Sequence, residues 1–320
     1  MRKRKKIITI LCTLCLAASV TGCGKGLHNA YVVNDGAFYF LEDTINHSDR
    51  FAANLAIIPK LSYLDQGFED DVTSELLINN TTNTPIVAVS AHAKIYPASL
   101  TKLMTAYLTC KYGKMDDVVT LEQDLRYESG AQLLHLKRGD KVTVSELYHG
   151  LLVYSANDCA SMLATYIAGS EEKFVDLMNQ EAKALGATNT HFQNSHGLHD
   201  PEHYTSAYDL YLMFKANLQY DIFKETVALD SYTMKYTNKN DQPLSVSFHS
   251  TNLYLTGTYK IPKGITMFGG KTGTTQAAGS CLIILTENKK GEEFISVVTG
   301  AMDKNILYNT MSKLLKQANK

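Results

Sequence analysis

The chain has 320 residues, of which 45% are hydrophobic and 20% are charged, and this composition excludes a disordered protein. Its length allows one large domain or two smaller ones. The formal net charge is −1, but subtracting the five basic residues at positions 2–6 leaves −6 for the remainder, which argues against a nucleic-acid partner.

Residues 1–22 are predicted to be a lipoprotein signal peptide. The five basic residues precede an apolar run of 14 residues, 7–20, which falls short of the roughly 18 to 20 that span a bilayer. The run ends in "VTGC", residues 20–23, which resembles a bacterial lipoprotein box. The resemblance implies that Cys23 carries a lipid that anchors the protein on the outer side of the cell membrane. An ordinary cleaved signal followed by a chance cysteine is the alternative.

Residues 23–60 are predicted to be the lipidated N-terminus and a tether, because their short apolar clusters show no clear period. After the signal and Cys23, three cysteines remain, Cys110, Cys159 and Cys281. They are odd in number and lack CxxC spacing, so neither a disulfide framework nor a zinc knuckle is predicted. We interpret them as small buried apolar side chains.

The domain itself is predicted over residues 61–320, with strands at both ends and helices between them. "SELLINN" (74–80) and "TPIVAVS" (84–90) are typical of short strands around a turn. A helix is predicted from Ser99 to about Tyr112 with Gly113 at its end, and another follows a capping-box pattern at residues 143–146. Further helices are predicted over 157–169, 170–186 and 205–218.

The C-terminal third is predicted to return to strands, at residues 232–237, 268–275, 280–287 and 293–301. The last two flank "NKKGEE" and predict an antiparallel hairpin. Residues 306–317 predict an amphipathic helix, for which packing on the sheet is a simpler interpretation than a membrane surface. This order predicts an α+β fold, in which one antiparallel sheet from both chain ends is flanked by helices and carries an inserted, mainly helical subdomain.

Ser99 and Lys102, in "YPASLTKLMTAYL" (96–108), stand three residues apart at the start of an apolar helix. They therefore project from one helix face. A lysine amine can take a proton from serine only when it is neutral, and burial or a second cation lowers its pKa. Residues 170–173 repeat the S-x-x-K pattern, but there we interpret the serine as an N-cap before acids in the first turn. Ser99 differs because it follows Pro97 where backbone N–H groups can face an anion.

Two further polar patterns follow along the chain. Ser155-Ala-Asn157 stands at the joint of two predicted helices, where we expect an exposed turn, and a plain loop with a helix-capping Asn is the alternative. Lys271-Thr272-Gly273, followed by Thr274, stands near the end of an apolar strand, and a Gly-rich turn is the alternative. Such residues are unusual in a strand core, and glycine permits close approach by a substrate that pairs with the strand edge.

In this order, the three patterns are those of β-lactamases and penicillin-binding proteins. The longer segments resemble the serine D-Ala-D-Ala carboxypeptidases, which are the low-molecular-mass penicillin-binding proteins of peptidase family S11. The resemblance spans about residues 70–315 and implies a DD-peptidase/β-lactamase-like catalytic domain. The segments that carry it are "YPASLTKLMTAYL", "LKRGDKVTVSELYHGLLVYSANDCA", "ALGATNTHFQNSHGL" and "GGKTGTTQAAGSCL".

The resemblance implies an extracytoplasmic enzyme that removes the terminal D-Ala from peptidoglycan stem pentapeptides, and it implies no cofactor and no metal. Ser99 would form the acyl-enzyme, Lys102 would accept its proton, Ser155 would relay a proton to the leaving amine, and Asn157 would orient the substrate amide and Lys102. β-Lactam antibiotics would acylate Ser99 and stall there as inhibitors.

The same resemblance assigns substrate binding to the third pattern. Lys271 would lower the pKa of Lys102 and attract the terminal carboxylate, which the hydroxyls of Thr272 and Thr274 would hold, with Gly273 between them. The backbone N–H groups of Ser99 and Thr274 would form the oxyanion hole.

Two departures from the family are visible. Many members carry a carboxylate-binding arginine just before the C-terminal helix, whereas this chain has Leu307 there and only Lys304 nearby. This puts the affinity for the carboxylate in doubt. Many members also continue into a C-terminal β domain, which we expect to be missing from a chain of 320 residues.

Three alternatives remain open. A class A β-lactamase would place a deacylating Glu in the window 189–198, which holds no acid. A zinc peptidase could use His196, His199 and His203 with Asp200, but Gly197 and Pro201 predict a loop, and no HExxH is present. The third is a β-lactam or muropeptide receptor that is acylated and never turns over.

Overall fold

The computed structural model describes residues 32–34, 37–39, 55–58, 71–128 and 130–320. The chain divides into two units, residues 1–50 and 51–320. In the first unit, β1 (Val32–Asn34) pairs antiparallel with β2 (Ala37–Tyr39). The predicted signal peptide, Cys23 and most of the predicted tether lie outside the described residues.

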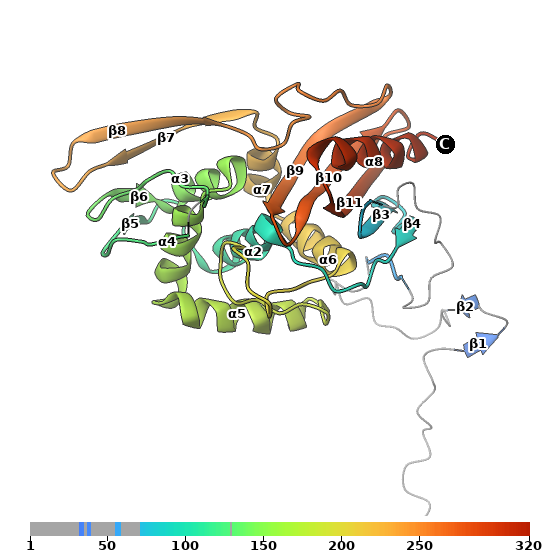
Figure 1. The fold of residues 1–320 in the computed structure, drawn as a ribbon, viewed down its shortest axis with the longest axis horizontal. Coiled ribbons are helices and arrows are strands. Elements are labelled where there is room, and N and C mark those ends of the chain that lie inside the picture. The colour runs from blue at the N-terminus through green and yellow to red at the C-terminus, as the bar shows by residue number, and fades with distance from the viewer. Residues whose placement is uncertain (1–31, 35–36, 40–54, 59–70, 129) are drawn as a thin grey trace, which may run out of the picture. The chain divides into compact units, whose positions relative to one another are not determined.

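A five-stranded antiparallel sheet in the second unit draws its strands from widely separated parts of the chain, as predicted (Figure 1). The first two strands are β3 (Ser74–Asn79) and β4 (Thr84–Val89). The other three are β9 (Ile265–Thr275), β10 (Gly279–Asn288) and β11 (Glu293–Ala301), in the order β4-β3-β11-β10-β9. The predicted hairpin is confirmed, with Leu285 opposite Ile295.

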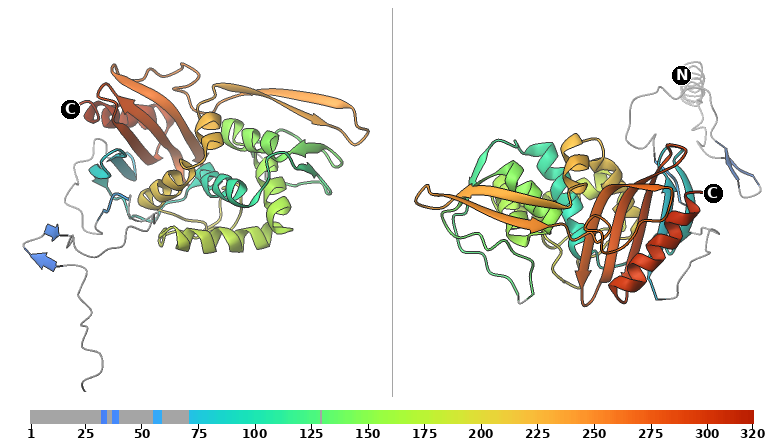
Figure 2. Two further views of the ribbon diagram at one scale, coloured as in Figure 1. Left: turned by 180° about the vertical axis from the view of Figure 1, so that it is seen from behind. Right: turned by 90° about the horizontal axis from the view of Figure 1, so that it is seen from above.

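Both faces of this sheet are covered, because successive residues of a strand point to opposite faces. Leu76 and Ile78 of β3 join the main core, whereas Leu77 between them packs with the C-terminal helix α8 (Lys304–Gln317). Figure 2 shows α8 lying along the sheet. Leu307, Met311 and Leu314 of α8 are buried, which confirms the packing predicted for this amphipathic segment.

Between β4 and β9 lie all the helices of the described residues except α8. The predicted helix at Ser99 begins with a 3-10 turn, η2 (Ala98–Thr101), and continues as α2 (Lys102–Tyr112). The others are α3 (Val144–His149), the π-helix η3 (Gly150–Tyr154), α4 (Asn157–Ala168), α5 (Glu171–Ala184), α6 (Ala207–Asn217) and α7 (Asp221–Val227).

Serine and threonine caps begin two of these helices as predicted. The Thr143 side chain accepts a hydrogen bond from the Glu146 N–H at 3.2 Å, and the Ser170 side chain accepts one from the Lys173 N–H at 3.2 Å. The S-x-x-K pattern at residues 170–173 is therefore the helix start that we inferred. The carboxylate of Glu146 accepts from the Lys235 N–H, so it does not complete a capping box.

A second antiparallel sheet was not predicted from the sequence. It consists of β5 (Val118–Thr120), β6 (Lys141–Thr143), β7 (Ser231–Thr237) and β8 (Pro243–His249), in that order. Only β7 was expected. The strand β8 begins with proline and is largely exposed, although Leu244, Val246 and Phe248 alternate with polar residues as in a half-buried strand. Figure 2 shows the β7–β8 hairpin projecting from the helical region.

Helix α2 runs through the centre of this unit, where residues 102–109 are all buried. A helix buried on every side has no polar stripe. Cys159 and Cys281 are buried, as interpreted, while Cys110 is partly buried, and all three are free thiols. Among the described residues, no helix combines the length and apolarity that crossing a membrane requires.

Candidate active site

The three sequence patterns meet at one cleft of about 210 Å³. Its walls come from the 3-10 turn η2, the turn between η3 and α4, and the strand β9. Six of the predicted site residues line it: Ser99, Ser155, Asn157, Thr272, Gly273 and Thr274. Lys102 and Lys271 are buried directly beneath this lining, within hydrogen-bond distance of the two serines.

The amine of Lys102 contacts three oxygen atoms. Its Nζ lies 3.0 Å from the Oγ of Ser99, 2.7 Å from the Oδ1 of Asn157 and 2.6 Å from the carbonyl oxygen of His196. The last two are acceptors only, so they take both N–H bonds of a neutral amine and leave its lone pair facing the Ser99 hydroxyl. This geometry suits transfer of the serine proton to the lysine.

Electrostatics favour the neutral form of this lysine. Burial is the main cause that holds the pKa of Lys102 well below its usual range, and the positive charge of Lys271 is the second. Since the side chain is completely buried, water does not offset the cost of a charge there. Lys102 is therefore placed and neutralised as a base for Ser99.

A second lysine–serine pair lies on the opposite wall. The Nζ of Lys271 donates to the Oγ of Ser155 at 2.8 Å and to the carbonyl oxygen of Thr272 at 2.9 Å. Burial lowers the pKa of Lys271 to about 7. Lys271 therefore loses its charge near neutral pH, and it carries a full positive charge only at lower pH.

The expectation of an exposed turn at Ser155 and Asn157 is wrong. The two side chains are only 5% and 3% exposed, because the amines of Lys271 and Lys102 cover them. Ser155 has a left-handed backbone with φ of 70°, as does Ala98, just before Ser99, with φ of 46°. Non-glycine residues adopt this region at a cost, and such strain is concentrated at functional sites.

Gly273 sets the approach of β9 to the 3-10 turn η2. A Cβ on this residue would lie 3.0 Å from the backbone nitrogen of Ser99 and 3.0 Å from the carbonyl oxygen of Pro97. Any side chain would therefore push the strand away from the serine. The glycine allows the backbone of Thr274 to come beside Ser99.

The histidines of the loop 191–203 serve other contacts. The Nε2 of His203 lies 2.7 Å from the Oγ1 of Thr101, and its Nδ1 accepts from the Gln193 N–H at 3.0 Å. Burial lowers the pKa of His203 to about 4 and that of His196 to about 3. The ring of His199 instead stands edge-on to Tyr96. Within the described ranges, no three His, Cys, Asp or Glu side chains are grouped to hold a metal ion.

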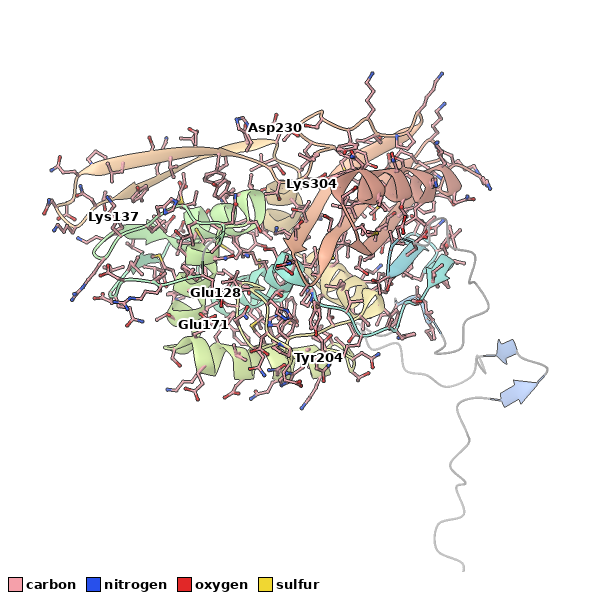
Figure 3. The ribbon with its side chains drawn as sticks, viewed as in Figure 1. Glu128, Lys137, Glu171, Tyr204, Asp230 and Lys304 are labelled. Carbon is pink, nitrogen blue, oxygen red and sulfur yellow. The ribbon has the colours of Figure 1, made fainter. Side chains whose placement is uncertain are left out.

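The far wall of the cleft was only partly foreseen. Lys304, Leu307 and Tyr308 of α8 line it together with Thr251. Figure 3 labels Lys304 at the start of α8, and its side chain is exposed, whereas Leu307 is buried. Thr251 lies in a loop without local pattern, 21 residues before Thr272, so no signal along the sequence pointed to it.

Solved structures share this fold over most of the chain. The structure of the Streptomyces K15 DD-transpeptidase superposes with a TM-score of 0.72 at 25% identity, covering 79% of this chain and 98% of that one. The D-alanyl-D-alanine carboxypeptidase DacD from Francisella tularensis gives a TM-score of 0.68 at 27% identity, covering 82% and 72%. The fold is therefore that of the DD-peptidases, as the sequence predicted.

The chain belongs to the D-alanyl-D-alanine carboxypeptidase family, peptidase S11, whose sequence profile matches residues 66–303. It is 36% identical over 256 residues to the D-alanyl-D-alanine carboxypeptidase DacC of Escherichia coli, covering 77% of this chain and 60% of that protein. It is 34% identical over 239 residues to DacF of Bacillus subtilis, covering 72% and 58%. The chain thus spans about three fifths of the length of these relatives.

Proposed function

We propose that this protein is a serine-type D-Ala-D-Ala carboxypeptidase that removes the terminal D-Ala from peptidoglycan stem pentapeptides through an acyl-enzyme on Ser99. The observation that carries the proposal is the buried amine of Lys102, whose Nζ lies 3.0 Å from the Oγ of Ser99 and whose pKa burial holds well below its usual range. Membership of the S11 family supports the substrate class and binding of β-lactams.

In the acylation step, the Oγ of Ser99 attacks the carbonyl carbon between the two D-alanines while its proton passes to the Nζ of Lys102. The developing oxyanion accepts hydrogen bonds from the backbone N–H groups of Ser99 and Thr274, and losing one such donor typically lowers the rate about 10²- to 10³-fold. The C–N bond then breaks as the proton on Lys102 passes through Ser155 to the leaving nitrogen, which makes Lys102 neutral again. Free D-alanine departs, and its carboxylate is held until then by Thr272 and Thr274.

Deacylation completes the cycle. A water molecule attacks the ester carbonyl carbon, Lys102 accepts a proton from the water, and the Oγ of Ser99 leaves and regains its proton. The products are the shortened stem peptide and the free enzyme. A β-lactam acylates Ser99 in the same way and remains there as a stalled ester.

We also propose that the enzyme works outside the cytoplasm, where peptidoglycan lies, and that a lipid on Cys23 anchors it to the cell membrane. The support is the basic segment, the short apolar run and the "VTGC" ending of residues 1–23. The proposed arrangement is a signal peptide over 1–22, a tether over 23–60 and a catalytic domain over 61–320.

The proposal is tested with the chain from residue 24 onward, a fluorescent penicillin and a peptide that ends in D-Ala-D-Ala. We expect covalent labelling that maps to the tryptic peptide containing Ser99, together with release of free D-Ala that penicillin blocks and a chelator does not. Labelling without release would assign the receptor function, and release that only a chelator stops would assign a zinc peptidase. An acyl group joined to an added amine would assign transpeptidation, the activity in the name of the Streptomyces K15 protein.

Lys304 is expected to supply part of the attraction for the substrate carboxylate, because it is the exposed cation at the cleft and Leu307 carries no charge. We expect Lys304→Gln to raise KM about 2- to 5-fold, since exposed charge interactions are weak. The effect should shrink at high salt. Lys316→Gln, at the other end of α8, is the matched control. An unchanged KM at low salt would show that the threonine hydroxyls and the buried Lys271 bind the carboxylate without Lys304.

The pH dependence of acylation is expected to report the two buried lysines. Lys102 must be neutral to accept the serine proton, so acylation should fall as the pH drops through its pKa. Lys271, whose pKa burial lowers to about 7, should give the alkaline limb when its charge is lost. Lys271→Met removes the like charge beside Lys102, so its pKa rises and the acid limb moves to higher pH.

This shift is measured from the rate of penicillin acylation between about pH 4 and about pH 10. Lys304→Gln, which removes an exposed charge rather than a buried one, should leave the acid limb in place. An acid limb that does not move in Lys271→Met would show that a group other than Lys102 controls it.

A further inference from the structure

We propose that Thr251 is a positioning residue, whose hydroxyl donates to the hydroxyl of Thr272 and thereby turns the proton of Thr272 toward the carboxylate of the substrate. The inference rests on the proposed function, because it concerns the terminal carboxylate of that substrate. It adds to the cleft a residue that belongs to none of the three sequence patterns.

The contact between the two threonines is short. The Oγ1 of Thr251 lies 2.5 Å from the Oγ1 of Thr272, both side chains are partly buried, and both line the cleft. One proton lies between the two oxygen atoms, and the proton of the accepting hydroxyl remains free. The direction of this hydrogen bond therefore decides what Thr272 presents to a ligand.

A carboxylate accepts hydrogen bonds and donates none. If Thr272 donated to Thr251, it would present lone pairs to the carboxylate and repel it. If Thr251 donates, Thr272 is free to donate to the carboxylate, and each hydrogen bond of the chain strengthens the next. A bound carboxylate therefore favours the arrangement in which Thr251 donates to Thr272 and Thr272 donates to the carboxylate.

Thr251 is fixed by its own backbone and by the residues that follow it. Its N–H donates to the carbonyl oxygen of Val153 at 3.2 Å, in the π-helix just before Ser155. Two residues later, the Leu253 N–H donates to the Oη of Tyr308 at 2.8 Å, and Tyr308 itself lines the cleft. The loop is thus attached to both walls, which a positioning hydroxyl requires.

Thr272 is consequently held at two points by groups from different elements. The ammonium of Lys271 fixes its carbonyl oxygen at 2.9 Å, while Thr251 fixes its side chain. The backbone contact places the strand, and the side-chain contact orients the hydroxyl. Removing the second should therefore disturb carboxylate recognition without disturbing attack by Ser99.

The test uses two acyl-D-alanyl thioesters that share the acyl group and differ in the leaving group. Mercaptoacetate carries a carboxylate at the place of the terminal one, and ethanethiol carries none. For Thr251→Val, which keeps the shape of the side chain, we expect kcat/KM to fall about 3- to 10-fold with the mercaptoacetate ester, mainly through KM. With the ethyl thioester, kcat/KM should change by less than about 2-fold. Thr251→Ser keeps the hydroxyl, so it should keep the wild-type preference for the mercaptoacetate ester.

Thr256→Val is the matched control, because Thr256 and Thr258 form another hydroxyl pair in the same loop at 3.2 Å, outside the cleft lining. It should leave both thioesters unchanged. The inference would be overturned if Thr251→Val lowered kcat/KM equally with both thioesters, or with neither. It would also be overturned if Thr251→Ser did not keep the wild-type preference for the mercaptoacetate ester. A wild-type protein that neither thioester nor penicillin acylates would instead overturn the proposed function.

Discussion

Ser99→Ala is expected to abolish covalent labelling by penicillin and to lower D-Ala release by at least about 10⁴-fold. The variant removes the only atom that can form the proposed ester, and it leaves the lone pair of Lys102 without a hydroxyl to deprotonate. The loss concerns one partly buried hydroxyl, so the fold should persist. Labelling, D-Ala release and thermal unfolding of the purified variant check the three parts of this expectation.

The other S-x-x-K pattern offers a matched control. Ser170 caps α5 by accepting from the Lys173 N–H, and it lies outside the lining of the cleft. Ser170→Ala is expected to keep full labelling while losing about 1 kcal/mol of stability, as the loss of an N-cap usually does. Labelling that survives in Ser99→Ala, or that vanishes in Ser170→Ala, would contradict the assignment of the nucleophile.

The main sheet and the helical region could be predicted because their signals are local. The strands β10 and β11 are continuous apolar runs around a polar turn, and the caps at Thr143 and Ser170 stand where a hydrophobic period begins. The second sheet contains no continuous apolar run, and only β7 of its strands was predicted. Its strands β5 and β6 are each three residues long, and they are strands because a neighbour pairs with them, not because of their own sequence.

The active site, too, could be predicted only where its signals are local in the sequence. The residue types of the three patterns identified the lysines and serines, since those chemical groups are rare at buried helix and strand positions. The pairing of Lys102 with Ser99 follows from their spacing along one helix, whereas the pairing of Lys271 with Ser155, and the burial of Ser155 beneath it, depend on tertiary packing. Thr251 shares a hydrogen bond with Thr272 only because its loop is attached to η3 and α8, so its place could not be read from the sequence.

Lys102→Met is expected to lower the rate of acylation by penicillin about 10²- to 10⁴-fold, the range that a general base contributes. Methionine fills a similar volume but accepts no proton, so Ser99 must attack as an unactivated hydroxyl. The change also leaves the Oδ1 of Asn157 and the carbonyl oxygen of His196 without this donor, at a cost of about 1–3 kcal/mol for each group left unpaired.

Methionine removes the free-energy cost of burying the Lys102 amine, and this offsets part of the cost of the two unpaired oxygen atoms. We therefore expect the variant to remain folded. The acylation rate constant at saturating penicillin and the unfolding temperature separate the two effects. The structure contains a competing pair, because the Nζ of Lys271 lies 2.8 Å from the Oγ of Ser155 on the opposite wall. Acylation within about 10-fold of the wild-type rate in a folded Lys102→Met variant would therefore assign proton acceptance to Lys271 acting through Ser155.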